Sequence, residues 1–251
     1  MNRSNASSIL YAFKSVFLAT ALFACAFLTP PRANGQAAGG DLQGKLAALK
    51  QSAAENQQKL HQYRWLETMQ VTLNGNARPA TQSMCQYGPD GKVQKSPMNP
   101  PQPQQAAGGG GGRLRQRIVE KKKEEVKDYM GQVKTLLAMY VPPDPQRMQQ
   151  AFQQHKVSIT PGGNSGVAQI VFKDYAQPGD QMTIFFDTAE KKISALNVNT
   201  YMDDPKDVVT LAVHFASLPD STNYVHDSVL NATAKKLVVT TTNSNYQPIG
   251  Q

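Results

Sequence analysis

The chain has 251 residues, a formal net charge of +8 and only two cysteines. This length suits one sizeable domain plus processed parts, and so few cysteines exclude a small disulfide-stapled scaffold. The modest positive charge favours solubility and weak attraction to anionic envelope surfaces, and gives no reason to expect nucleic-acid binding.

The N-terminus has the pattern of a secretory signal. Arg3 and Lys14 precede an apolar run of 13 residues, Val16–Leu28. A helix that crosses the bilayer core needs about 20 residues, so the run is too short to span it and fits the apolar region of a signal peptide. The small residues Ala33 and Gly35 place the cleavage site near Gln36. We therefore expect residues 1–35 to be removed and the protein to be periplasmic or secreted.

Cys25 offers an alternative, because Leu22-Phe23-Ala24-Cys25 is an imperfect lipobox that would make this cysteine a lipidated N-terminus. The bulky Phe23 and the apolar run beyond the cysteine favour conventional cleavage instead. Cys85 then remains alone, without a disulfide partner. It is either a reactive thiol or a strand cysteine on a half-buried face, and its setting favours the second.

The first part of the mature chain predicts a helix followed by short strands. Leucines and alanines recur at helical spacing from Asp41 to Tyr63. Alternating segments and the turn residues between them then predict strands at Trp65–Leu73, Ala80–Tyr87 and Lys92–Gln94, joined by turns at Asn74-Gly75 and Gly88-Pro89-Asp90-Gly91.

Ser96–Gly112 is rich in proline, glutamine and glycine and has too little apolar surface to fold. It is either a flexible insertion within one domain or a linker between two. The short strands before it could not form a stable domain alone, which favours an insertion.

A long helix is predicted from Arg113 to Tyr140. Its second half has an apolar stripe typical of core packing. Its first half is strongly charged and is either a surface for an acidic partner or anionic lipid, or a solvated helix end. The candidate partner residues are Arg113, Arg115, Arg117, Lys121 and Lys122.

Pro142-Pro143 ends this helix, and Asp144-Pro145 begins a short one that stops near His155. Period-two alternation fills the rest of the chain. The predicted strands are Lys156–Thr160, Val167–Tyr175, Gln181–Asp187, Lys192–Asn199, Val208–Phe215, Tyr224–Leu230 and Leu237–Thr242. The fold class is therefore α+β, a single domain over residues 36–251. A curved antiparallel sheet, an incomplete β-barrel, is covered by an N-terminal helix and a middle helix pair.

No catalytic or metal motif is recognisable. The histidines, among them His214 and His226 near Asp227, match no metal-ligand spacing, and Asp203, Asp204 and Asp207 match no EF-hand loop. No serine lies in a nucleophile elbow. We therefore expect a non-enzymatic protein without a metal or cofactor.

A curved sheet forms an apolar pocket where its helices do not fill the concave face. The candidate lining residues are Trp65, Met69, Phe172, Ile184, Phe186, Leu196, Val198, Leu211 and Val213. The alternative is that these side chains simply pack against the helices.

A predicted helix leads into Tyr63-Arg64-Trp65 and is followed by strands, two middle helices and then consecutive hairpins. The order of these predicted elements resembles that of the LolA/LolB-like superfamily. The resemblance implies a half-barrel capped by helices that carries lipid or lipoprotein acyl chains in the periplasm. It also implies transient contact with a membrane surface, and we expect a monomer. The competing hypothesis is an envelope structural or interaction module with a filled core and the basic helix as its contact surface.

Overall fold

The computed structural model describes residues 51, 54–98, 113–163 and 166–250; the predicted signal peptide and most of the proline–glycine segment lie outside these ranges. Within the described part, one antiparallel sheet of 11 strands follows the order β4-β3-β1-β11-β10-β9-β8-β7-β6-β5, with β2 paired to β1. The strands are β1 Tyr63–Leu73, β2 Asn76–Ala77, β3 Thr81–Tyr87, β4 Val93–Pro97, β5 Val157–Thr160, β6 Val167–Lys173, β7 Gln181–Asp187, β8 Lys192–Tyr201, β9 Val208–Ser217, β10 Asn223–Ala232 and β11 Leu237–Pro248.

The sheet is curved and does not close into a barrel, as the sequence predicts, and the ends of its order are β4 and β5. From β5 to β11 each strand pairs with its neighbour in sequence, so these strands form a series of hairpins. Strands β1 and β11, which are far apart in the sequence, pair antiparallel, with Tyr63 opposite Pro248 and Leu73 opposite Leu237. This pairing joins the first strands of the domain to its last.

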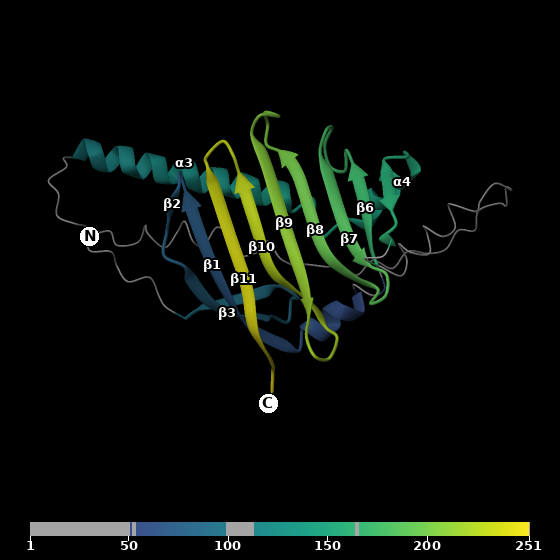
Figure 1. The fold of residues 1–251 in the computed structure, drawn as a ribbon. Helices are drawn as coiled ribbons and strands as arrows, with labels where there is room; N and C mark the ends of the chain where they lie inside the picture. Colours follow the sequence, from purple (N-terminus) through teal and green to yellow (C-terminus); the bar gives the residue numbers. More distant parts are fainter. Residues whose placement is uncertain (1–50, 52–53, 99–112, 164–165, 251) are drawn as a thin grey trace.

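Two helices, α3 (Arg113–Leu137) and α4 (Pro145–Gln153), lie on the same face of the sheet (Figure 1). The first turn of α4 follows the predicted pattern: Asp144 accepts a hydrogen bond from the backbone N–H of Gln146, and Pro145 occupies the first position. Residues 54–60 are also helical. No helix in the described part is long and apolar enough to cross a membrane.

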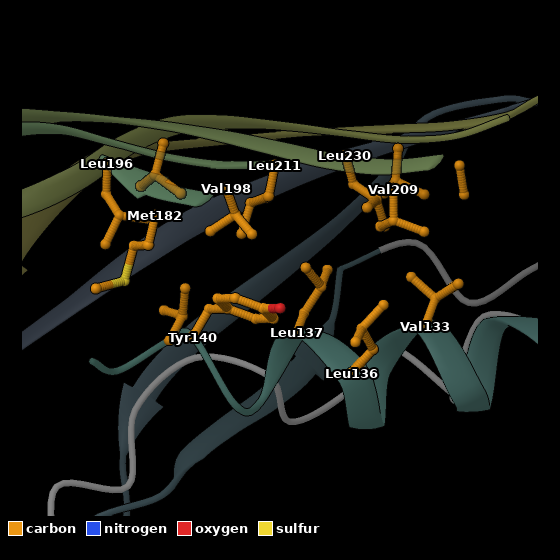
Figure 2. Close-up of a cluster of buried hydrophobic side chains, with 14 of the residues drawn as sticks. Val133, Leu136, Leu137, Tyr140, Met182, Leu196, Val198, Val209, Leu211 and Leu230 are labelled. Carbon is orange, nitrogen blue, oxygen red and sulfur yellow. The ribbon is translucent and has the colours of Figure 1, made fainter. Parts of the chain in front are cut away.

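The core lies between the concave face and the second half of α3. Figure 2 shows side chains of the central strands facing those of Val133, Leu136 and Leu137 on α3 and Tyr140 just after it. Val133 and Tyr140 are completely buried. The predicted apolar stripe is thus core packing, and the second half of α3 forms a layer of the domain over this part of the sheet.

Two tyrosine hydroxyls attach α3 and the segment after it to loops of the sheet. Tyr129 donates to Asp207 at 2.8 Å, in the β8–β9 connection, and Tyr140 donates to Asp180 at 2.5 Å, just before β7. Burial, followed by the hydrogen bond to the carboxylate, raises the pKa of both tyrosines well above the usual value. Both hydroxyls therefore stay protonated and remain donors over the physiological pH range.

Most element boundaries differ from those predicted by one to three residues; α3, for example, ends at Leu137 and not at Tyr140. Three further differences concern the ends of the domain. The N-terminal helix ends at residue 60, and Tyr63, predicted as its last residue, begins β1. β4 extends to Pro97, so Ser96 and Pro97, placed in the insertion by composition, pair with β3. β11 continues to Pro248, six residues beyond the predicted Thr242. In both strands, backbone hydrogen bonds to a neighbour stabilise polar segments whose own strand propensity is low.

Candidate functional site

The concave face has two halves that differ in burial. We call the part opposite α3 the covered half; it includes Val198, Val209, Leu211 and Leu230, all at most 4% exposed. We call the opposite ends of the strands the distal half. Figure 1 shows α3 crossing the sheet near the strand ends that carry the covered half.

The distal half contains apolar side chains that are only partly buried. Phe186 on β7 lies opposite Ile193 on β8, and Phe215 on β9 lies opposite Val225 on β10. All four pack against the core without being completely enclosed by it. Apolar surface that is continuous with the core and remains accessible is a common feature of ligand sites. The distal half is therefore the candidate functional site.

The residues predicted to line a cavity divide between these two halves. Seven belong to the main buried cluster, where the central strands meet α3 and α4: Met69, Phe172, Ile184, Leu196, Val198, Leu211 and Val213. Phe186 is at the margin of that cluster, and Trp65 lies outside it, in the distal half. The structure therefore brings most of the predicted set together as tightly packed core, and their contact with a ligand stays a prediction.

Trp65 is at the centre of a group of aromatic rings that we call the aromatic cluster. Its ring stacks on Tyr246 with centroids 5.5 Å apart and contacts Tyr87 at 5.4 Å. Tyr246 in turn lies 4.3 Å from Tyr224, and His61 stacks on Tyr87 at 4.4 Å. Strands β1, β3, β10 and β11 thus contribute rings to one place in the distal half.

Polar groups hold Trp65 in position. Its indole N–H donates to the side-chain oxygen of Asn243 at 3.2 Å, and the Asn243 amide donates to the carbonyl of Val225 at 2.9 Å. Asn56, in the helix of residues 54–60, exchanges hydrogen bonds with the backbone of Asn223 at the start of β10. These bonds connect the helix, β10 and β11 around the cluster and fix the orientation of its central ring.

An ion pair lies beside the aromatic cluster. Lys95 on β4 contacts both carboxylate oxygens of Glu67 on β1 at 2.6 Å, and the two side chains are 14% and 10% exposed. Burial, and then the neighbouring Tyr87 hydroxyl, raises the pKa of Tyr246 far above its usual value; burial does the same for Tyr87. The distal half therefore combines aromatic rings, neutral hydroxyls and one internally neutralised pair of charges.

The sequence indicated Trp65 but not Tyr87, Tyr224 or Tyr246. Tyr246 lies in the unpredicted end of β11, and its meeting with Trp65 depends on the register of β1 against β11. The sequence contains one hint of the aromatic cluster, since tyrosines recur near the ends of segments that form strands. Without knowledge of how the strands pair, it does not indicate that these strand ends lie together.

The other candidate groups are accounted for by local contacts. His214 and His226 both hydrogen-bond to Asp227, at 2.7 and 2.9 Å. Burial alone would raise the pKa of Asp227, but the hydrogen bonds from both imidazoles outweigh it and lower the pKa. Within the described ranges, no group of three or more His, Cys, Asp or Glu side chains is arranged to hold a metal ion.

The charged first half of α3 is in contact with solvent where its side chains are described. Arg117, Lys121 and Lys122 are exposed. Arg113 and Arg115 belong to the helix, but their side chains lie outside the described part. The proposed partner surface therefore has accessible charges, and its use in binding stays a prediction.

Cys85 is a completely buried, free cysteine on β3. Burial, assisted by the nearby Glu67 charge, raises the pKa of its thiol to about 12. Since the thiolate is the reactive form, we expect the folded protein to react with a disulfide reagent at pH 8 on the order of 100-fold or more slowly than the unfolded protein. Thiol titration in a Cys25→Ser background would measure this. Equal rates in the folded and unfolded states would show that Cys85 is an accessible, reactive thiol.

Comparison with known proteins reveals similarity only to solved structures. No protein-family profile matches the chain, and no curated protein matches it. A DUF1329 family protein from Desulfovibrio piger aligns with 8% identity and a TM-score of 0.41, covering 83% of this chain and 94% of that one. A putative outer membrane lipoprotein-sorting protein domain from Vibrio parahaemolyticus aligns with 9% identity and a TM-score of 0.35, covering 83% and 93%. At these scores, the function has to be inferred from the geometry of the site itself.

Proposed function

We propose that this chain is an exported, non-enzymatic binding protein that holds the apolar chain of a lipid or lipidated protein on the concave face of its sheet. The observation that carries the proposal is the partly exposed apolar surface of the distal half. Phe186, Ile193, Phe215 and Val225 extend the fully buried core toward solvent. A flexible acyl chain could cover this surface with no requirement for directional bonds.

The packing of the covered half restricts where such a ligand would enter. Tyr129 and Tyr140 attach α3 to the sheet, and its apolar residues fill the space against the central strands. Entry between α3 and the covered half would break these bonds and separate packed side chains. The distal half exposes apolar surface without that rearrangement, so the chain would enter there.

The N-terminal pattern supports the same role. An apolar run of 13 residues after Arg3 and Lys14, followed by small residues, directs the chain out of the cytoplasm. Lipids and lipidated proteins that cross an aqueous compartment need their apolar chains shielded. An exported sheet with accessible apolar surface on its concave side supplies that shielding, in the periplasm or at the membrane surface that the carrier contacts.

The charge variant Phe186→Glu tests this proposal. It places a carboxylate in the distal half, where desolvation by an acyl chain would be costly, and we expect affinity for a fluorescent fatty acid to fall about tenfold or more. Native mass spectrometry followed by organic extraction would show whether the wild-type protein carries lipid from the envelope and whether the variant loses it.

Val229→Glu is the matched control, because Val229 on β10 is 38% exposed and lies outside the core cluster. It should keep wild-type fatty-acid affinity. Circular dichroism must show that both variants are folded. A wild-type protein that contains no lipid and takes up no fatty acid would exclude the carrier role. An equal loss of fatty-acid affinity in both variants would show that the ligand does not bind specifically in the distal half.

The exposed basic half of α3 favours a second candidate function, an envelope interaction module. Arg117, Lys121 and Lys122 are available to an acidic partner or an anionic membrane surface. If the protein holds no lipid, binding to vesicles that contain phosphatidylglycerol would test this function. Reversing these three charges to glutamate should then abolish the binding.

A further inference from the structure

The aromatic cluster has hydrogen-bonding capacity that the protein does not use. The hydroxyls of Tyr87, Tyr224 and Tyr246 make no hydrogen bond to any described residue, whereas Tyr129 and Tyr140 both bond to carboxylates. No completely buried side-chain nitrogen or oxygen in the described part lacks a partner. The three unbonded hydroxyls must therefore keep some contact with solvent, although Tyr87 and Tyr246 lie in a strongly desolvated setting.

The charges near these hydroxyls indicate what kind of ligand they suit. Lys95 contacts both oxygens of Glu67, so the pair provides neither a free cation for a phosphate nor a free carboxylate for an amine. The groups that remain available are phenol hydroxyls, which can both donate and accept hydrogen bonds, and the aromatic surfaces that surround them. This combination matches a ligand with several hydroxyls, no charge and apolar C–H faces.

We infer that the aromatic cluster is a binding subsite for an uncharged sugar ring, recognised by the hydroxyls of Tyr87, Tyr224 and Tyr246 and by the rings around Trp65. The ring belongs either to a free sugar or to the headgroup of a glycolipid. The glycolipid form rests on the proposed function, since its acyl chain would lie on the neighbouring apolar residues Phe215 and Val225. The free-sugar form does not depend on it.

Trp65 makes the subsite directly observable, because it is the only tryptophan in the chain. Its fluorescence would be titrated with octyl glucoside below the critical micelle concentration, with octyl phosphocholine and with glucose. We expect a saturable change with octyl glucoside at about tenfold or more lower concentration than with octyl phosphocholine. Saturation by glucose at a similar concentration would identify a free sugar as the ligand, and a response to octyl glucoside alone would identify a glycolipid headgroup.

The variants Tyr87→Phe and Tyr246→Phe keep the rings and remove the hydroxyls. Each should weaken octyl glucoside binding by about three- to tenfold while octyl phosphocholine binding is unchanged. The control is Tyr201→Phe, since the Tyr201 hydroxyl donates to the carbonyl of Pro178 at 2.6 Å, outside the cluster. Tyr201→Phe should leave the titration unchanged.

The outcomes separate this inference from the proposed function. Equal affinity for the two amphiphiles, or no effect of the cluster variants on octyl glucoside, overturns the sugar subsite even if a fluorescent fatty acid still binds. A specific glucose response in a protein that takes up no fatty acid supports the subsite and excludes the lipid carrier. No response to any of the three probes overturns the subsite.

Discussion

Asp180→Ala is expected to lower the free energy of unfolding by about 3 kcal/mol or more. The Asp180 side chain is buried, and its carboxylate accepts hydrogen bonds from the Tyr140 hydroxyl and from the backbone N–H groups of Tyr175, Ala176 and Gln177. Removing the carboxylate leaves the buried N–H of Tyr175 and two part-buried backbone N–H groups without a partner. The same change weakens the attachment of the segment after α3 to the sheet, because the Tyr140 hydroxyl then has Thr200 on β8 as its one remaining partner.

Urea denaturation of Asp180→Ala beside Asp204→Ala would measure the effect. Asp204 also accepts a backbone hydrogen bond in a turn, from Lys206, but it is exposed. Its replacement should cost less than about 1 kcal/mol. Similar small losses in both variants would mean that the Asp180 network does not hold α3 against the sheet, and that α3 could act as a movable cover.

Lys95→Met is expected to destabilise the protein by about 3 to 5 kcal/mol, because it leaves the Glu67 carboxylate nearly buried without its counter-ion. The double variant Glu67→Met, Lys95→Met should recover most of this loss, since two apolar side chains of similar length then replace the pair. The interaction free energy from this double-mutant cycle separates the cost of leaving Glu67 unpaired from the cost of lost packing.

The control for this pair is Lys92→Met, which breaks an exposed contact of 3.9 Å with Asp90. We expect its stability to stay within about 0.5 kcal/mol of wild type, measured by denaturant unfolding. A double variant no more stable than Lys95→Met would show that Glu67 and Lys95 have separate partners or roles. The distal half would then not be the neutral environment on which the sugar subsite depends.

Together these two experiments test the division of the concave face. If Asp180 fixes α3, the covered half is permanent core, and ligand binding is restricted to the distal half with its half-buried apolar residues and aromatic cluster. If α3 is only weakly attached, the predicted lining residues that it covers, among them Val198 and Leu211, become accessible to an acyl chain. The carrier hypothesis is compatible with either result, but the position of the ligand differs.

The sequence predicted the local structure well where short-range chemistry decides it. Asn74 and Gly75 both adopt a positive φ, of 52° and 76°, at the predicted turn after β1. The alternation of Met182 and Ile184, and of Leu196 and Val198, predicted which faces are buried, and all four are at most 2% exposed. Neighbouring residues contain this information, because side chains alternate across a strand and only certain residues suit a tight turn.

The sequence by itself therefore determined the open, curved α+β sheet, most of its hairpins and the apolar layer, and it predicts export. Only the tertiary structure decided that β1 pairs with β11, that the polar segment from Asn243 to Gln247 is a strand, and that Trp65 meets Tyr246. These features depend on contacts between residues more than 150 positions apart, whose pairing leaves no periodic pattern in either segment. The covered half could be predicted from hydrophobic alternation, but the aromatic cluster exists only because the two ends of the domain lie side by side.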